Sequence, residues 1–233
     1  MTVVAIQQPN YMPWLGYFYK IAAADVFVFL DDVQFSKNSY INRAKILGNG
    51  ESRWLSVAVS VHLGDAICAV RPTREDWSDA HLDTLRTFYG NAEAFDAVWP
   101  RVQEIYRSAL GKNIAAINRA LVEDLAGEMG LACRFVASSE IETGTATGDD
   151  RLVAIMSVLA PGGTYLSGKG GSNYQEPRKF ANAGITLRYS DFRPPTYDQG
   201  GSDFVPGLSV LDAVFRMGWR GAADLLMTRI EAA

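Results

Sequence analysis

The first forty-three residues constrain the fold more than any other part of the chain. A short apolar run over residues 3–6 leads into a polar loop with two prolines, and an amphipathic segment over residues 14–24 follows. A second apolar run over residues 26–30 ends in Asp31-Asp32. This order predicts a βαβ unit whose two polar loops lie at the carboxyl ends of adjacent parallel strands. Ligands bind at that edge of open α/β sheets, so the segment also predicts where the active site lies.

Strands and helices continue to alternate along the rest of the chain. Residues 43–47 and 54–61, separated by a Gly-Asn-Gly turn, predict an antiparallel hairpin that decorates the edge of the parallel sheet, with a third strand over residues 67–71. The other expected elements are helices over residues 76–89, 94–110, 113–130, 149–159, 176–183, 209–215 and 222–230, and strands over residues 134–137, 165–166 and 185–189. The pattern predicts one three-layer α/β sandwich with a mostly parallel sheet, in a single domain over residues 1–233.

Composition excludes several classes of protein. Apolar residues make up 48% of the chain, enough for a sizeable core, and the net charge of −4 argues against a broad nucleic-acid-binding surface. No apolar stretch approaches about eighteen residues, so we expect no membrane-spanning helix. The N-terminus lacks the basic region and cleavage site of a signal peptide. Cys68 and Cys133 are isolated and predict buried, reduced thiols, so we expect a cytoplasmic protein.

The first candidate site is the loop that follows the first apolar run. It offers two amides and a phenol on a backbone stiffened by proline, and the helix N-terminus beyond it could receive a phosphate or a carboxylate. The catalytic candidates are Gln7 and Tyr11, and the substrate-binding candidates are Gln8, Asn10 and Trp14. The alternative is a tight βα turn in which Tyr11 and Trp14 serve packing.

The second candidate site follows the second apolar run. Carboxylates at the end of a strand can bind a metal, hold sugar hydroxyls or deprotonate a nucleophile, and we expect one of Asp31 and Asp32 to be catalytic. The substrate-binding candidates that follow are Gln34, Lys37, Asn38, Asn42 and Arg43. Lys37 and Arg43 could neutralise a diphosphate. The alternative is that an aspartate caps the next turn within a solvated loop.

The third candidate site follows the short strand over residues 165–166. A glycine-rich loop there can cradle phosphates with its backbone N–H groups. Its substrate-binding candidates are Ser167, Gly168, Lys169, Gly171 and Tyr174. The spacing matches neither GxxxxGK[ST] nor GxGxxG, so an ordinary loop is the alternative. The two histidines and two cysteines of the chain are too dispersed to predict a zinc site, and we assign no metal ligand.

The chain resembles the WbqC-like protein family over essentially its whole length. The resemblance is carried by QQPNYMPWLGYFYKIAAADVFVFLDDVQFSKNSYINR, WLSVAV, TYLSGKGGSNY and LSVLDAVFRMG. The family opening usually reads His-Gln-Pro, and Gln7 stands at the position of the histidine. An amide hydrogen-bonds but does not relay a proton near neutral pH, so proton transfer is expected of Asp31 or Asp32 instead.

The resemblance implies a bacterial protein linked to surface-polysaccharide (O-antigen) biosynthesis, in which amino sugars on nucleotide carriers receive acyl or aminoacyl groups. At the level of fold the chain is also similar to pantothenate synthetase and other nucleotidyltransferase-like, Rossmann-like folds. Those proteins use a loop with two histidines against ATP phosphates. The corresponding loop, residues 7–16, has none, which disfavours adenylyl transfer.

Taken with the candidate residues, the resemblance implies a cytoplasmic transferase that acylates or aminoacylates an amino group, such as that of a nucleotide-linked amino sugar. Asp31 or Asp32 would free the amine, Gln7, Gln8 and Tyr11 would orient the reactants, and the basic residues and the glycine-rich loop would hold phosphates. No motif identifies an acyl-CoA or aminoacyl-tRNA donor, a cofactor or an oligomeric state. The alternatives are a nucleotidyltransferase that uses a nucleoside triphosphate and magnesium, and a non-catalytic sugar-nucleotide-binding protein.

Overall fold

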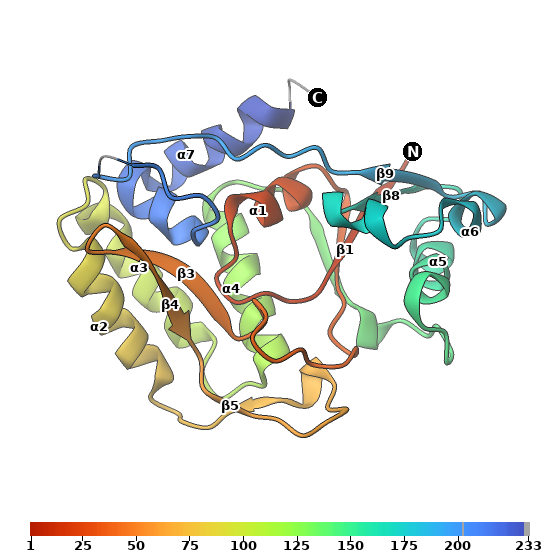
Figure 1. Cartoon of the computed structure of the whole chain (residues 1–233), viewed down its shortest axis with the longest axis horizontal. Helices are drawn as coiled ribbons and strands as arrows, with labels where there is room; N and C mark the ends of the chain where they lie inside the picture. The colour runs from red at the N-terminus through yellow and green to blue at the C-terminus, as the bar shows by residue number, and fades with distance from the viewer. Residues whose placement is uncertain (202, 231–233) are drawn as a thin grey trace.

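The computed structural model describes residues 1–201 and 203–230, and a five-stranded parallel sheet runs through its centre (Figure 1). The strand order is β7 (Arg134–Ala137), β2 (Val26–Phe29), β1 (Val3–Gln7), β8 (Thr164–Ser167) and β9 (Thr186–Tyr189). The chain therefore runs outward from β1 to one edge of the sheet and from β8 to the other. The carboxyl ends of β1 and β8 flank the point where the strand order reverses, which is where doubly wound sheets bind ligands.

Helices cover both faces of this sheet, which confirms the predicted three-layer α/β sandwich. The first layer consists of α1 (Leu15–Ala22), α2 (Trp77–Tyr89), α3 (Phe95–Ser108), α4 (Ile114–Glu128) and α7 (Val210–Ile230), and the second of α5 (Gly148–Leu159) and α6 (Pro177–Asn182). In β1, Ala5 packs into the core under the first layer, whereas Val4 and Ile6 pack into the core under the second. Because both faces of the strand are buried, its sequence is a continuous apolar run.

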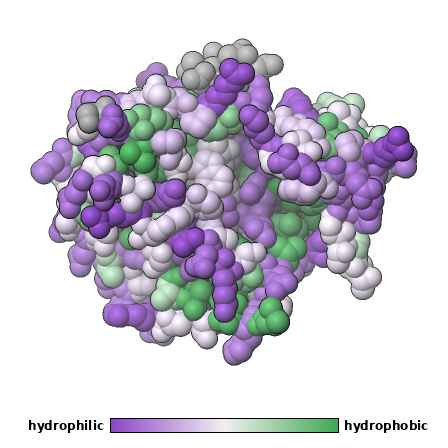
Figure 2. Space-filling model, in the orientation of Figure 1, coloured by the Kyte–Doolittle hydropathy of each residue, from purple (hydrophilic) through white to green (hydrophobic). Residues whose placement is uncertain are grey.

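Shorter elements complete the fold. Three 3₁₀ turns lie at η1 (Ile67–Ala69), η2 (Ser138–Glu140) and η3 (Lys169–Asn173). The two helices predicted near the C-terminus are joined in α7 across a kink at Gly218, whose φ is 74° and ψ is 175°. None of the described helices has the length and apolar character needed to cross a membrane. On the face shown in Figure 2, hydrophilic residues predominate and hydrophobic residues form small groups between them.

The predicted hairpin is present as β3 (Arg43–Gly48) and β4 (Glu51–Ser56). Asn49 and Gly50 form its turn with φ of 54° and 79°, the positive values that a tight hairpin turn requires. The predicted position at the edge of the parallel sheet is wrong. The hairpin forms a separate two-stranded sheet, because its apolar residues enter the core of the first helical layer. There the backbone N–H of Leu47 donates to Tyr89 Oη of α2 at 2.8 Å.

Two strand predictions beside the hairpin also need correction. The single strand predicted over residues 54–61 is broken at residues 57 and 58. Val57 still lies opposite Asn42 and its N–H donates to Asn42 O at 2.8 Å, but its carbonyl accepts from the Asn42 side-chain Nδ2, at 2.9 Å, so the regular backbone ladder ends there. Only β5 (Val59–Ser60) resumes beyond it. Most of the strand predicted over residues 67–71 is η1, and just β6 (Arg71–Pro72) pairs with β5.

The N-terminus of α4 offers a direct test of the local structure. Asn113→Ala is expected to lower the free energy of unfolding by about 1 kcal/mol, because Asn113 Oδ1 accepts a hydrogen bond from the N–H of Ala116 at 2.8 Å. Thermal unfolding followed by circular dichroism should show a melting temperature about 2–4 °C lower. Asn113→Ser keeps a capping oxygen and should behave like the wild type. An alanine variant of unchanged stability would contradict the cap.

Candidate functional site

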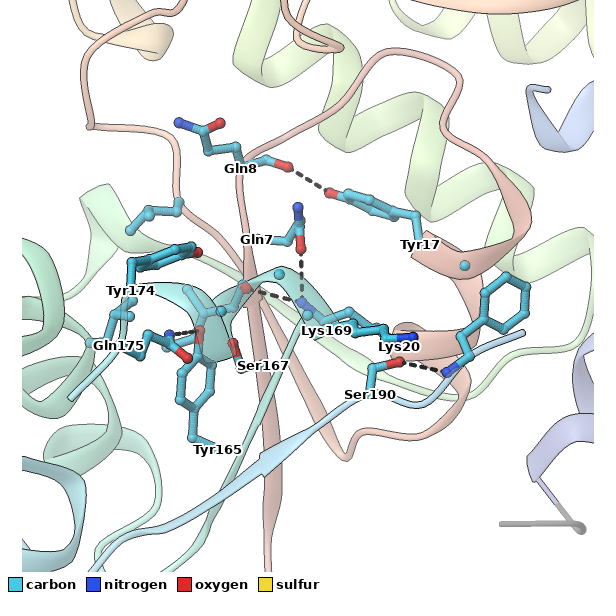
Figure 3. A pocket seen from close by; sticks show the side chains of 18 of the residues that line it. Gln7, Gln8, Tyr17, Lys20, Tyr165, Ser167, Lys169, Tyr174, Gln175 and Ser190 are labelled. Carbon is cyan, nitrogen blue, oxygen red and sulfur yellow. Dashed lines mark hydrogen bonds between the residues drawn. The ribbon is translucent and has the colours of Figure 1, made fainter. Parts of the chain in front are cut away.

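A cavity of about 610 Å³ opens at the carboxyl edge of the sheet, where β1 and β8 diverge (Figure 3). The end of β1 supplies Gln7 and Gln8, and α1 supplies Tyr17 and Lys20. Most of the remaining wall comes from residues 165–175, in β8 and the loop beyond it, and from the segment after β9, while Leu30 just after β2 and Leu152 of α5 close it. Small-molecule sites commonly measure about 300–1,000 Å³, so the cavity has the size of a ligand site. It lies where the first forty-three residues predict one.

The charge of this cavity contrasts with that of the whole protein. The chain carries a net charge of −4, yet the described residues that line the cavity include Lys20 and Lys169 and no aspartate or glutamate. Lys20 lies at the floor beside β1, and Lys169 lies on η3 and is exposed. Because the described wall holds no carboxylate, the cavity favours an anion beside Lys169. The cavity is therefore suited to a ligand that carries a phosphate or a carboxylate.

Lys20 has an unusual environment. Its side chain is only 4% exposed, and its Nζ donates to Ile6 O at 3.2 Å and to Gln7 Oε1 at 2.8 Å (Figure 3). No described carboxylate forms an ion pair with it. Burial lowers the pKa of Lys20 from the usual 10.5 to about 7, because the charged form loses its hydration. A substantial share of the protein therefore carries Lys20 as a neutral amine at physiological pH.

Sequence reasoning did not single out Lys20, because a lysine on an amphipathic helix is usually solvated. A signal was nevertheless present in the composition of α1. The helix LGYFYKIA is apolar or aromatic on almost every side, and six of its eight residues are buried. A helix that is apolar all round is enclosed by the protein, so its single charged residue is enclosed with it.

The glutamines of the first loop lie at the cavity as predicted. The Gln7 carboxamide points toward Lys20 and accepts its hydrogen bond (Figure 3). The backbone carbonyl of Gln8 accepts from Tyr17 Oη at 3.0 Å. Trp14 lies at the border of the cavity and packs against Tyr40, with 5.0 Å between the ring centroids. The structure thus brings these three predicted residues together, while their roles stay predictions.

The glycine-rich loop forms the opposite wall. Ser167 is buried at the end of β8, and an added Cβ on Gly171 would lie 2.4 Å from both Ser167 Oγ and Gln175 Oε1. A larger residue at this point would displace the Ser167 and Gln175 side chains from their positions at the cavity. Gln175 is only 7% exposed, and its Oε1 is buried without a hydrogen-bond partner in the described part of the chain. A buried acceptor of this kind is rare in folded proteins.

The rim of the cavity is formed by the same loop. Gly168 and Lys169 line it at the start of η3, and the Tyr174 ring is 75% exposed beside it. All five residues predicted in the third candidate site therefore line one cavity. Gln175, Ser190 and Phe192 line it as well and had no signal in the local sequence pattern.

Asp31 and Asp32 lie elsewhere. Asp31 Oδ1 accepts from the N–H of Ser139 at 3.0 Å, and Oδ2 accepts from Ser139 Oγ at 2.8 Å. Asp32 accepts from Ser138 Oγ and forms an ion pair with Arg151 of α5. Both carboxylates thus attach the end of β2 to η2 and α5. Neither belongs to the residues that line the cavity of Lys20 and Lys169, hereafter the lysine cavity. Their predicted catalytic role stays a prediction.

Asp31 instead borders a smaller cavity of about 220 Å³, together with Cys68 and Ser139. Burial, together with the neighbouring Asp31 and Asp32, raises the pKa of the Cys68 thiol, so this thiol is a poor nucleophile. Among the described residues, no group of three or more histidine, cysteine, aspartate or glutamate side chains is arranged to hold a metal ion.

Tyr11 lies in the protein core. Its hydroxyl is hydrogen-bonded to His81 Nδ1 at 2.7 Å and to Tyr106 Oη at 3.1 Å, and its side chain is fully buried. Burial raises the pKa of Tyr11 well above its usual value and lowers that of His81 to about 4. Asn10 beside it is also buried. Neither residue lines the lysine cavity, so the structure separates them from Gln7 and Gln8.

The basic residues of the second candidate site form a third location. Lys37, Asn38 and Asn42 border a shallow hollow of about 400 Å³ with β5. The Arg43 guanidinium lies over the Trp54 ring, 4.0 Å from its centroid, and donates to the carbonyl of Asn38. Gln34 is exposed and forms a single β-bridge with Ala66. The predicted residues thus divide among separate places, and the lysine cavity gathers the largest set.

The doubly wound parallel sheet, with helices on both faces and a cavity at its reversal point, places this protein in the α/β class. Within that class, this chain belongs to the WbqC-like protein family, which it matches over residues 8–223. It is also 31% identical over 222 residues to the uncharacterized protein Rv1507c of Mycobacterium tuberculosis, which covers 94% of this chain and 95% of the relative. No solved structure matches the chain significantly.

Proposed function

We propose that this protein is a transferase that attaches an acyl or aminoacyl group to the amine of a nucleotide-linked amino sugar. The observation that carries the proposal is the cavity at the reversal point of the sheet, which holds two lysines and no described carboxylate. Such a site attracts a diphosphate, and its volume of about 610 Å³ is sufficient for a small substrate. We place the reaction in the cytoplasm, in agreement with the sequence prediction.

The rim supports a nucleotide at one end of the substrate. Lys169 is exposed on η3 and can pair with a phosphate. Tyr174 follows the same turn, and its ring is 75% exposed although tyrosine is usually at least half buried. An exposed aromatic ring at the mouth of a ligand cavity offers a surface on which a nucleotide base can stack. The two residues together fit a base and a diphosphate.

The floor supports an amine at the other end. Gln175 Oε1 is a buried acceptor with no partner among the described residues, and rotation of the side chain toward the cavity would let it accept from an N–H donor of the substrate. Gln7 offers a second amide from β1, in the wall opposite the glycine-rich loop. Membership of the WbqC-like family supports the setting, since the resemblance implies surface-polysaccharide biosynthesis. The acyl donor would be a thioester such as acyl-CoA or an ester such as aminoacyl-tRNA.

The experiment that tests this function has two stages. Thermal-shift measurements with UDP- and dTDP-linked amino sugars, without magnesium, should raise the melting temperature, as binding to the folded state does. Incubation with the same sugars and acetyl-CoA or aminoacyl-tRNA should then give the N-acylated sugar by mass spectrometry. Stabilisation by ATP with magnesium and not by the sugars would replace the proposal by nucleotidyl transfer. Binding of the sugars without turnover by any donor would instead indicate a non-catalytic sugar-nucleotide-binding protein.

Lys169→Met is expected to weaken the binding of UDP or dTDP about tenfold, because a charge-assisted hydrogen bond to phosphate contributes roughly 1.5 kcal/mol. Isothermal titration calorimetry measures the change. Lys179→Met is the matched control, since Lys179 lies on α6 outside the cavity and pairs with Asp150 at 3.0 Å. Equal affinities for the two variants would contradict phosphate binding by Lys169.

A further inference from the structure

We infer that Lys20 is the general base of this site, and that its neutral amine takes the proton released when the acceptor amine attacks the acyl donor. The inference rests on the proposed function for the identity of the reaction. It adds a catalytic residue that neither the family match nor the sequence motifs point to. Three observations carry it: the hydrogen bonds of Nζ, the absence of a neighbouring described carboxylate, and the position of Nζ at the cavity.

The hydrogen bonds of Nζ match a neutral amine. A neutral lysine has two N–H groups and one lone pair, whereas an ammonium has three N–H groups and no lone pair. Nζ has two acceptors in the described chain, Ile6 O at 3.2 Å and Gln7 Oε1 at 2.8 Å. Both N–H groups of the neutral form are therefore used, and the lone pair is left over. Because Lys20 lines the cavity, that lone pair is available to a proton donor bound there.

The surroundings keep the amine neutral. The other titratable side chains that line the cavity come from α1, β8 and the loop after β8, and they are Tyr17, Tyr165, Lys169 and Tyr174. Of these only Lys169 is charged at neutral pH, and a second cation does not favour protonation of Lys20. Beyond the cavity wall, Asp191 after β9 accepts from Tyr19 Oη at 3.4 Å. The lowered pKa of Lys20, about 7, is close to the value that suits a general base at physiological pH.

The step balances without any other group. The acceptor nitrogen uses its lone pair to attack the carbonyl carbon of the thioester or ester, a C–N bond forms and the carbonyl π pair moves to oxygen. The proton of the attacking nitrogen passes to Lys20 Nζ. The oxygen pair then re-forms the carbonyl, the bond to the leaving sulfur or oxygen breaks, and Lys20 returns the proton to that atom. The products are an amide and a thiol or an alcohol, and Lys20 is again neutral.

A structural role alone explains Lys20 poorly. A methionine of similar length would fill the same space without any buried charge or unmet hydration. An ion-paired lysine would keep its charge through a neighbouring carboxylate, and no described carboxylate pairs with Lys20. A buried lysine that is kept unpaired beside a cavity is costly for folding and useful for proton transfer.

Labelling of amines provides a test that needs no substrate. The full-length protein is treated with trace acetic anhydride from pH 5.5 to pH 10, and acetylation of each lysine is read by mass spectrometry. Lys20 should reach half of its maximal reactivity near pH 7, well below the pH of about 10 that is typical of a free lysine amine. Gln7→Glu should move the Lys20 midpoint upward by about 1–3 pH units, because a carboxylate in place of Gln7 Oε1 favours the ammonium.

Turnover variants then test the role in catalysis. Lys20→Arg cannot lose its proton, and Lys20→Met provides a second variant in case the arginine variant does not fold. Each substitution should reduce kcat about 10²- to 10⁴-fold. Lys112→Arg is the matched control at an exposed loop and should keep the wild-type kcat. A Lys20 midpoint near pH 10, an unshifted midpoint in Gln7→Glu, or full turnover by Lys20→Arg would each overturn the inference. Labelling does not depend on turnover, so it stays decisive for Lys20 even where the proposed transferase reaction fails.

Discussion

Lys20→Met should raise the melting temperature of this protein by about 4–8 °C at pH 7, although it removes the proposed base. Moving the pKa of a buried lysine from 10.5 to about 7 corresponds to roughly 4 kcal/mol of destabilisation at neutral pH, since each pKa unit is about 1.4 kcal/mol. Loss of the hydrogen bonds to Ile6 O and Gln7 Oε1 offsets part of this gain. The expected net stabilisation is about 2 kcal/mol, measured by chemical unfolding at pH 7.

The difference in unfolding free energy between the wild type and Lys20→Met should depend on pH, and its direction follows from the lowered pKa of Lys20. The folded-state pKa of Lys20 lies below the unfolded-state value, so between pH 7 and about 10.5 the unfolded chain binds more protons than the folded protein. Wild-type stability, measured relative to Lys20→Met, must therefore rise with pH across this window. The advantage of the variant should shrink by roughly 1 kcal/mol per pH unit above pH 8. A variant less stable than the wild type at pH 7, or a difference that does not change with pH, would contradict the buried neutral amine.

Asp31→Ala is expected to lower the free energy of unfolding by about 3 kcal/mol, with a melting temperature about 6–12 °C lower. The substitution removes a buried carboxylate that accepts from Ser138 Oγ, Ser139 N and Ser139 Oγ at 2.8–3.1 Å. These bonds attach the end of β2 to η2, and the alanine leaves both Ser139 donors unsatisfied, whereas Ser138 Oγ can still donate to Asp32. Chemical unfolding measures the effect, and Asp31→Asn should lose less because it keeps one acceptor oxygen. An alanine variant within about 0.5 kcal/mol of the wild type would contradict this anchoring role.

Variants of Asp31 and Asp32 also distinguish between the two candidates for the general base, which are these aspartates and Lys20. The sequence prediction is that Asp31→Asn and Asp32→Asn abolish turnover, whereas the cavity geometry expects turnover to survive in the folded fraction of each variant. Asp32→Asn is the cleaner case, because Asp32 is partly exposed and its amide can still accept from Ser138. Turnover should be expressed per folded molecule, with stability measured on the same samples. Loss of turnover at unchanged stability would return the proton transfer to the aspartates and contradict the assignment to Lys20.

Local patterns predicted most of the fold. The apolar runs of β1 and β2, the helical spacing of α2 to α4 and the Asn113 cap depend on neighbours in the sequence, and all are confirmed. Errors arose where distant contacts decide the backbone. The strand predicted over residues 54–61 stops after Ser56, where the Asn42 side-chain amide bonds the carbonyl of Val57, and the hairpin joins the helical layer because its apolar residues pack into the core there. The local alternation of apolar and polar residues predicts neither contact.

For this protein, the sequence by itself determined the βαβ opening, the edge of the sheet at which the cavity opens, and membership of the WbqC-like family. Tertiary structure alone decided which polar side chains share that edge. In the folded protein Lys20 donates to Gln7, Tyr11 is buried in the core against His81, and Asp31 accepts from Ser139 of η2. The physical reason is that hydration and pairing of a charged group depend on the elements that enclose it. Those around Lys20 come from β1, β8 and the segment after β9, which are far apart in the chain.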